Sequence, residues 1–188
     1  NLGLMQKMFK YNTDFTTAPN GLGGDLNFRI KTKSGGMFKY YGNFDTNQMA
    51  VQSPSLEPGY DESKVALKGS NMFHTLSFKQ KLGSYLINSS ASYSMNDAKL
   101  NFAALKDGAV LSAFDFNNKG NYLNFKTVVD RKINRISAIR GGLELNDAHD
   151  TNNFGKDHRD LLSSFFAETD LGFSNNLSAK LGVRAEHS

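Results

Sequence analysis

The chain has 188 residues, no cysteine and a formal net charge of +4 at pH 7. The absence of cysteine excludes a disulfide framework and a thiolate metal site. The 22 lysines and arginines are spread along the chain, which favours solvated polar faces over a nucleic-acid-binding patch. No apolar run approaches the roughly 20 residues that a membrane helix needs. Plentiful Phe (15) and Tyr (7), with three prolines, favour a twisted β protein.

The first motif in chain order is GLGGDLNFRIKTKSG, residues 21–35. A phosphate-binding loop needs the spacing G-x-G-x-x-G and a helix that begins after it. Here the glycines stand at Gly21, Gly23 and Gly24, and an alternating strand pattern follows them instead of a helix. The glycines are therefore interpreted as permitting tight turns and close backbone approach ahead of a strand, and no nucleotide or other cofactor is expected.

Alternation of apolar and polar residues next predicts strands over residues 36–44, 72–81 and 85–95. A tight turn at 82–84 joins the last two of these strands. The alternation slips near 69–71, which predicts a β-bulge at that point. A long polar connection is expected at 52–62.

The second half of the chain repeats this plan, with strands predicted over residues 121–130, 139–145, 161–173 and 177–188. Tight turns are predicted at 131–134 and 174–176. Residues 96–121 are either a long polar excursion or a long hairpin with Asp107-Gly108 at its tip. Residues 146–160 are predicted to be a long polar loop.

The predicted strands exceed the usual soluble length of about 5–6 residues and match the roughly 9–11 tilted residues that cross a bilayer. Short turns at one end and long connections at the other are typical of an outer-membrane β-barrel, with apolar residues facing lipid and polar residues facing the lumen. A soluble β-sandwich also alternates, but it has no reason to segregate turn lengths by end. About seven long strands are counted, an odd number that cannot close a bacterial barrel, so the chain is expected to be a piece of a longer protein.

Two motifs carry a family resemblance. Residues 21–35 resemble the end of the plug domain in TonB-dependent outer-membrane receptors, with Gly23, Gly24, Asn27, Thr32 and Lys33 at the motif positions and Asp25 departing from them. The tail is similar to a recurrent barrel hairpin of the same family, through Phe166, Glu168, Leu177, Gly182, Arg184 and Glu186. The resemblance implies an all-β fold of antiparallel transmembrane barrel strands, in which residues 1–35 end the plug and 36–188 form part of the barrel. The plug-to-barrel hinge would comprise Gly21, Gly23, Gly24, Asn27 and Lys33.

By the same resemblance, the function would be active uptake of a nutrient (an iron chelate, a vitamin, a glycan or a peptide) across the outer membrane of a Gram-negative bacterium. The partners implied are outer-membrane lipid, the TonB complex through an upstream segment absent here, and a surface lipoprotein; no nucleic acid is implied. The short turns would be periplasmic and the long loops extracellular. The residues that would face the substrate in the loop 146–160 are His149, Asp150, Asn153 and His158.

No catalytic set is found, so no enzyme activity is expected. The spacing of the histidines and aspartates in 146–160 fits no regular metal site, and no strained turn such as G-x-S-x-G presents a nucleophile. Glu168 and Glu186 are expected to pair with Arg184 or Lys180 on the polar faces of neighbouring strands. Two alternatives stay open: a passive or structural outer-membrane barrel, such as a porin or adhesin, and a soluble β-sandwich that acts as a binding module.

Overall fold

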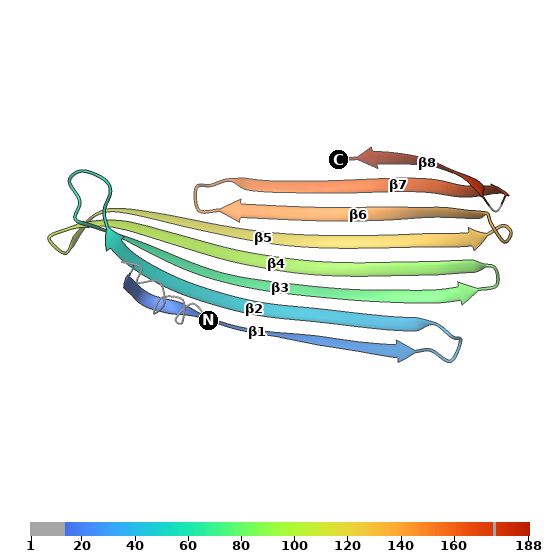
Figure 1. Cartoon of the computed structure of the whole chain (residues 1–188), viewed down its shortest axis with the longest axis horizontal. Coiled ribbons are helices and arrows are strands. Elements are labelled where there is room, and N and C mark those ends of the chain that lie inside the picture. Colours follow the sequence, from blue (N-terminus) through green and yellow to red (C-terminus); the bar gives the residue numbers. More distant parts are fainter. Residues whose placement is uncertain (1–13, 175) are drawn as a thin grey trace.

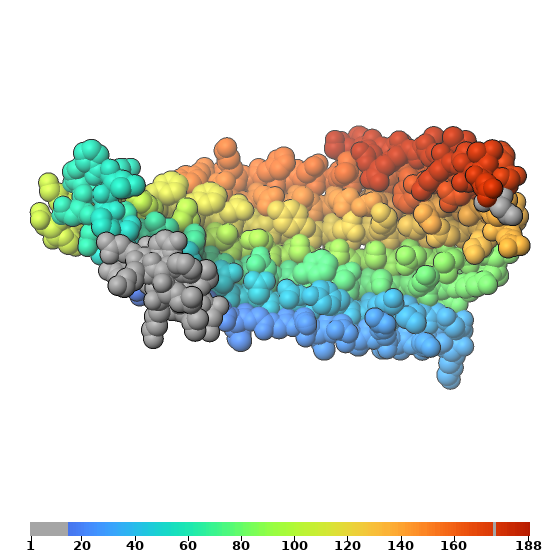
Figure 2. Space-filling view, in the orientation of Figure 1, coloured from blue at the N-terminus to red at the C-terminus, as the bar shows by residue number. Residues whose placement is uncertain are grey.

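A computed structural model describes residues 14–174 and 176–188 of the chain. These residues form one antiparallel sheet in which every strand pairs with its neighbours in sequence, from β1 at one edge to β8 at the other (Figure 1). The strands are β1 (Asp14–Lys31), β2 (Met37–Pro54), β3 (Glu62–Leu82), β4 (Tyr85–Lys106), β5 (Ala109–Lys132), β6 (Ala138–Asn152), β7 (Asp157–Ser174) and β8 (Leu177–His187). Figure 2 shows them side by side as one continuous surface.

The predicted short turns are confirmed. They join β3 to β4 at 83–84, β5 to β6 at 133–137, two residues later than predicted, and β7, which ends at Ser174, to β8, which begins at Leu177. Together with the turn at 32–36 between β1 and β2, they lie at the same end of the sheet (Figure 1). Within the described residues, no helix is both long and apolar enough to cross a membrane.

The connections at the opposite end are mostly extended hairpins. Residues 96–121 form the long hairpin, because β4 and β5 pair up to a two-residue tip in which Asp107 and Gly108 have φ of 50° and 76°. The prediction of a long loop over 146–160 is wrong: β6 and β7 pair out to Thr151 and Asp157, and only 153–156 are a turn. Both sheet faces here carry polar residues, so the sequence lacks the alternation that reveals a strand.

The sheet has eight strands where about seven were predicted. The additional wall strand is β1, which pairs with β2 from Asp14 to Lys31. Gly21, Gly23 and Gly24 therefore lie inside a paired strand, whereas Lys33 lies in the turn that follows.

The predicted apolar rows share one face of the sheet, called here the outer face. The register aligns Phe38 with Phe78 and Phe125 with Leu145, and strand alternation keeps these rows in phase from β1 to β8. The outer-face side chains remain exposed: 47% of the surface of Leu76 and 59% of that of Phe165 is accessible. The polar residues between them line the opposite, inner face.

The sandwich alternative is not supported by this arrangement. Among the described residues, the buried apolar side chains are Ala50, Ala104 and Phe166, and all eight strands belong to a single sheet. A sandwich would bury its apolar rows against a second sheet about 10 Å away. The apolar rows here have no such second layer.

The predicted bulge at 69–71 is wrong, and the cause of the slip in alternation is different. β3 pairs with β2 and with β4 in unbroken register through Gly69 and Asn71. Beyond this point the apolar residues change faces: Leu67 and Leu100 occupy inner positions, while Lys68 and Lys99 occupy outer ones. The strands therefore continue regularly, and only the face that carries the apolar residues changes.

A substitution at Gly142 tests how closely the side chains of the inner face are packed. A Cβ at this position would lie 2.6 Å from the Thr127 carbonyl oxygen and 2.6 Å from Cζ of Phe166, which covers the glycine. We expect Gly142→Ala to destabilise the folded protein by about 1–3 kcal/mol, because backbone must move to admit the methyl group. The adjacent Gly141→Ala is the control, since its Cβ would meet nothing closer than the Phe166 carbonyl oxygen at 3.6 Å.

The two glycine variants are compared by their thermal unfolding midpoints in the same detergent. Equal midpoints for the two variants would contradict the close packing of Phe166 over Gly142.

Candidate functional site

Two adjacent cross-strand rows on the inner face consist almost entirely of small and amide side chains. The first row runs in register from β1 to β7 through Gly23, Asp45, Asn71, Asn96, Gly120, Asp150 and His158. The second runs from β1 to β6 through Gly21, Asn47, Gly69, Ala98, Asn118 and Asn152. We call these thirteen positions the amide belt.

Both carboxylates of the amide belt accept hydrogen bonds from neighbouring side chains. Asn71 donates from Nδ2 to Oδ1 of Asp45 over 3.0 Å, and the Tyr122 hydroxyl donates to Oδ1 of Asp150 over 2.6 Å. Gly120 makes the second contact possible, because a Cβ there would lie 2.6 Å from Oδ1 of Asp150 and 2.8 Å from the Tyr122 hydroxyl.

An apolar surface adjoins the amide belt on the side away from the short turns. It occupies the next two inner rows, Met49, Leu67, Leu100 and Phe116, followed by Val51, Val65, Phe102 and Phe114. Phe154, from the β6–β7 turn, stacks at 5.5 Å from Phe114 and 5.9 Å from Phe116, measured between ring centroids. We call these nine residues the apolar shelf.

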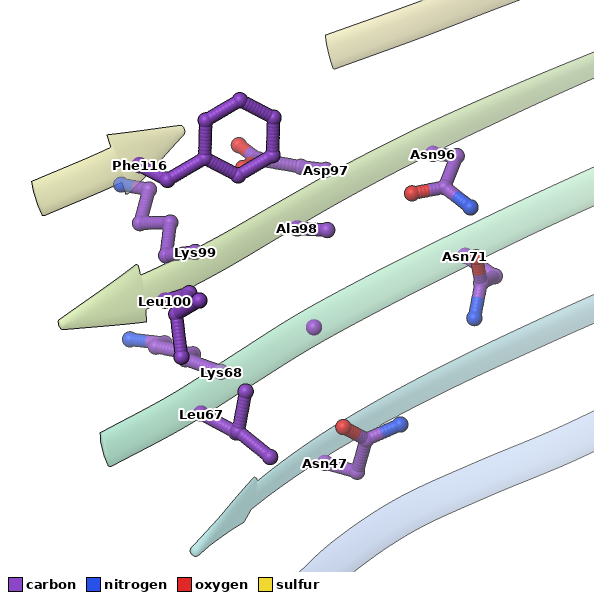
Figure 3. A pocket seen from close by; sticks show the side chains of 11 residues that line it. Asn47, Leu67, Lys68, Asn71, Asn96, Asp97, Ala98, Lys99, Leu100 and Phe116 are labelled. Carbon is purple, nitrogen blue, oxygen red and sulfur yellow. The ribbon is translucent and has the colours of Figure 1, made fainter. Parts of the chain in front are cut away.

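A depression of about 310 Å³ lies where the amide belt meets the apolar shelf. Figure 3 shows Asn47, Asn71 and Asn96 along one side of it and Leu67, Leu100 and Phe116 along the other. Gly69 and Ala98, which are register partners, form its floor. The depression is therefore amide-lined on one side and apolar on the other.

The four loop residues predicted to face a substrate do not form one site. Asp150 and His158 are register partners on the inner face, but His149 is on the outer face, where its Nε2 lies 2.7 Å from Oδ1 of Asp157. Asn153 lies in the β6–β7 turn and connects it to β5, because the backbone N–H of Asn117 donates a hydrogen bond to Oδ1 of Asn153 over 2.9 Å. Across the described residues, no group of three or more His, Asp or Glu side chains is placed to hold a metal ion.

The predicted hinge residues are also separated. Gly21 and Gly23 belong to the amide belt. Gly24 lies at an outer-face position and Asn27 at an inner one, opposite Tyr41. Lys33 lies in the turn at 32–36, which Gln80 of β3 holds by donating to the Ser34 carbonyl oxygen over 3.0 Å.

Residues toward the short-turn end of the inner face form ion pairs across β5 to β8. The predicted pairing of Glu168 and Glu186 is confirmed: Lys180 lies 3.2 Å from Glu168, and Arg184 lies 2.5 Å from Glu186. The other members are Lys126, Asp130, Arg140 and Glu144. These pairs are partly solvated, so they neutralise charge on the wall and add little stability individually.

Sequence reasoning missed the asparagines of the amide belt and the aromatic residues of the apolar shelf. One signal for them was available, because the slip in alternation at 69–71 marks the level at which apolar residues move to the inner face. Interpreting that slip as a bulge concealed the change of face. The proximity of Asn96 and Phe116 could not be predicted from the sequence, because it depends on the register between β4 and β5.

The single curved meander, its apolar outer face and its polar inner face define the fold of part of an outer-membrane β-barrel wall. Among solved structures, the chain is similar to the copper transporter OprC, with a TM-score of 0.68 and 10% sequence identity. The match covers 92% of this chain and 30% of OprC, so this chain spans less than a third of that protein.

A second similar structure is the Pseudomonas putida toluene transporter TodX, with a TM-score of 0.45 and 10% identity over 90% of this chain and 55% of TodX. No protein-family model matches the chain, and no curated protein sequence matches it. The similarity to OprC establishes the barrel-wall fold and does not show a plug domain.

Proposed function

We propose that this chain is part of a TonB-dependent transporter that takes up a nutrient across the outer membrane of a Gram-negative bacterium. The observation that carries the proposal is the inner wall, where the amide belt and apolar shelf form a binding-type surface beyond the apolar band. The motifs at residues 21–35 and at the chain's tail support the same family. The single-layer barrel-wall fold is consistent with transport.

The lengths of the strands support a wall that extends past the bilayer. β4 has 22 residues, and its outer-face apolar residues run from Tyr85 to Met95. At about 3.4 Å per residue the strand spans roughly 75 Å, whereas the hydrocarbon core is about 30 Å thick. The part beyond Met95, including the depression, would therefore lie on the extracellular side, within reach of an arriving nutrient.

The partners proposed for the whole protein follow from this position. The outer-face band would contact lipid, and the TonB complex would act through a segment upstream of this chain. A surface lipoprotein could dock on the extended hairpins of β2–β3 and β4–β5. Of the four loop residues predicted to face the substrate, Asp150 and His158, on the inner face, are proposed to border the nutrient pathway, whereas His149 lies on the outer face and Asn153 in the β6–β7 turn.

The assignment of residues 1–35 to the end of a plug is also a proposal. The glycine motif and its resemblance support it, and Lys33 would mark the junction to the wall. Residues 1–13 lie outside the described structure. A passive or structural barrel is the second candidate, and one observation favours it: β1 pairs with β2 along its length, so the glycine segment has a place in the wall without any plug.

Paired arginine substitutions test which face of the sheet meets lipid. Leu76 is an outer-face residue of β3, and Ser77, the next residue, is on the inner face. In the full-length protein folded into vesicles, Leu76→Arg should lower the free energy of unfolding by about 2–4 kcal/mol, because a charge near the bilayer midplane is costly. Ser77→Arg should change it by less than about 1 kcal/mol, since the lumen is wet. Equal destabilisation by both would contradict the assignment of the faces.

Energy coupling separates active transport from a passive barrel. A strain that lacks the full-length protein should lose growth on one limiting iron, vitamin, glycan or peptide source, and a strain without functional TonB should show the same loss. The reason is that a plugged transporter needs force from the inner membrane to open. Growth that depends on the protein but not on TonB would instead identify the passive barrel.

A further inference from the structure

We infer that the depression between the amide belt and the apolar shelf binds an uncharged, polyhydroxylated ligand, a neutral saccharide, as the nutrient of the transporter. This inference rests on the proposed function, because it names the substrate class of that same inner wall. Its starting point is the two-sided lining of the depression: asparagine amides on one side, and Phe116, Leu100 and Leu67 on the other (Figure 3).

The amides match hydroxyl groups. Each asparagine side chain offers two N–H donors and a carbonyl acceptor, so it can bond to two adjacent hydroxyls that each donate and accept. Asn47 and Asn96 are exposed on the inner face, on either side of Gly69 and Ala98. The small floor residues let a flat ring approach the sheet between these amides.

The apolar edge matches the other surface of a sugar. A pyranose ring has a face of C–H groups, which packs against an aromatic ring and is removed from water by it. Phe116 stands at the rim of the depression, and its ring is held by stacking on Phe154 at 5.9 Å. A pocket with an aromatic surface and a few fixed polar groups is the usual form of a small-molecule site.

The charge pattern disfavours an ionic ligand. No lysine or arginine occupies an inner position of the amide belt, and its two aspartates already accept hydrogen bonds from Asn71 and Tyr122. Lys68, Asp97 and Lys99 also line the depression, but all three occupy outer positions of their strands. A ferric chelate with net negative charge would therefore find no counter-charge in this part of the wall.

A pure hydrocarbon is disfavoured for the opposite reason. It would cover the asparagine amides without hydrogen-bonding them, and an unsatisfied polar group removed from water costs about 1–3 kcal/mol. A bare cation is disfavoured as well, because the described residues contain no cluster of His, Asp and Glu suited to a metal ion. A neutral ligand with hydroxyl groups and an apolar face satisfies both sides of the depression.

The test is calorimetric titration of the purified full-length protein in detergent with four neutral probes: maltohexaose, cellohexaose, xylohexaose and mannohexaose. Ferric citrate and toluene serve as the charged and apolar comparison ligands. We expect at least one hexasaccharide to bind, with its affinity reduced about fivefold by Asn96→Ala and about tenfold by Phe116→Ala.

Matched controls lie on the other face of the same strands. Asn101→Ala in β4 and Phe125→Ala in β5 remove the same kinds of group from outer positions and should leave saccharide affinity within about twofold of the wild type. The absence of binding by all four hexasaccharides, or binding that is indifferent to Asn96→Ala and Phe116→Ala, would overturn the inference.

The outcomes also separate this inference from the proposed function. TonB-dependent uptake of ferric citrate at the same rate by wild type and by Asn96→Ala would preserve active transport and overturn the saccharide site. Conversely, saccharide binding that requires Asn96 and Phe116, together with growth independent of TonB, would preserve the site and remove active transport.

Discussion

The continuous backbone hydrogen-bond ladder is the constraint on which the rest of this structure depends. Each strand of the sheet pairs with its neighbours in sequence, and pairing within the protein is what strands need wherever water is excluded. Regular pairing sets the alternation of side chains between two faces. The separation of Leu76 from Ser77, and of the outer apolar band from the amide belt, follows from this alternation.

Because the strand pairing continues past the outer apolar band, the face that carries apolar residues changes along a strand. In the half of β4 near the short turn, Tyr93 and Met95 are outer residues; farther along, Leu100 and Phe102 are inner residues. In this part of the strand the outer face carries polar residues such as Asn101. The apolar residues lie on the inner face beside the amides, and the depression is formed where the two groups meet.

Much of the wall could be predicted from the sequence. The sequence predicted tight turns near 82–84, 131–134 and 174–176, and it predicted the apolar rows of the outer face. Both are local patterns, which can be recognised in a single sequence. The hairpin at 96–121 was left open and the strands within 146–160 were missed, because polar residues on both faces remove the period-two signal. His149 and Asp150 were grouped by proximity in sequence, although adjacent residues in a strand point to opposite faces.

By itself, the sequence determined that the chain is an amphipathic antiparallel β protein, which residues form its apolar face, and where its tight turns fall. All of these depend on contacts between residues close in the chain. Only the tertiary structure decided the register, and with it the alignment of Gly23, Asn71, Asn96 and Asp150 in one row and the position of Phe116 beside Leu100. A shift of one residue would turn each of these side chains to the other face, and no local pattern in the polar part of the strands distinguishes the two arrangements.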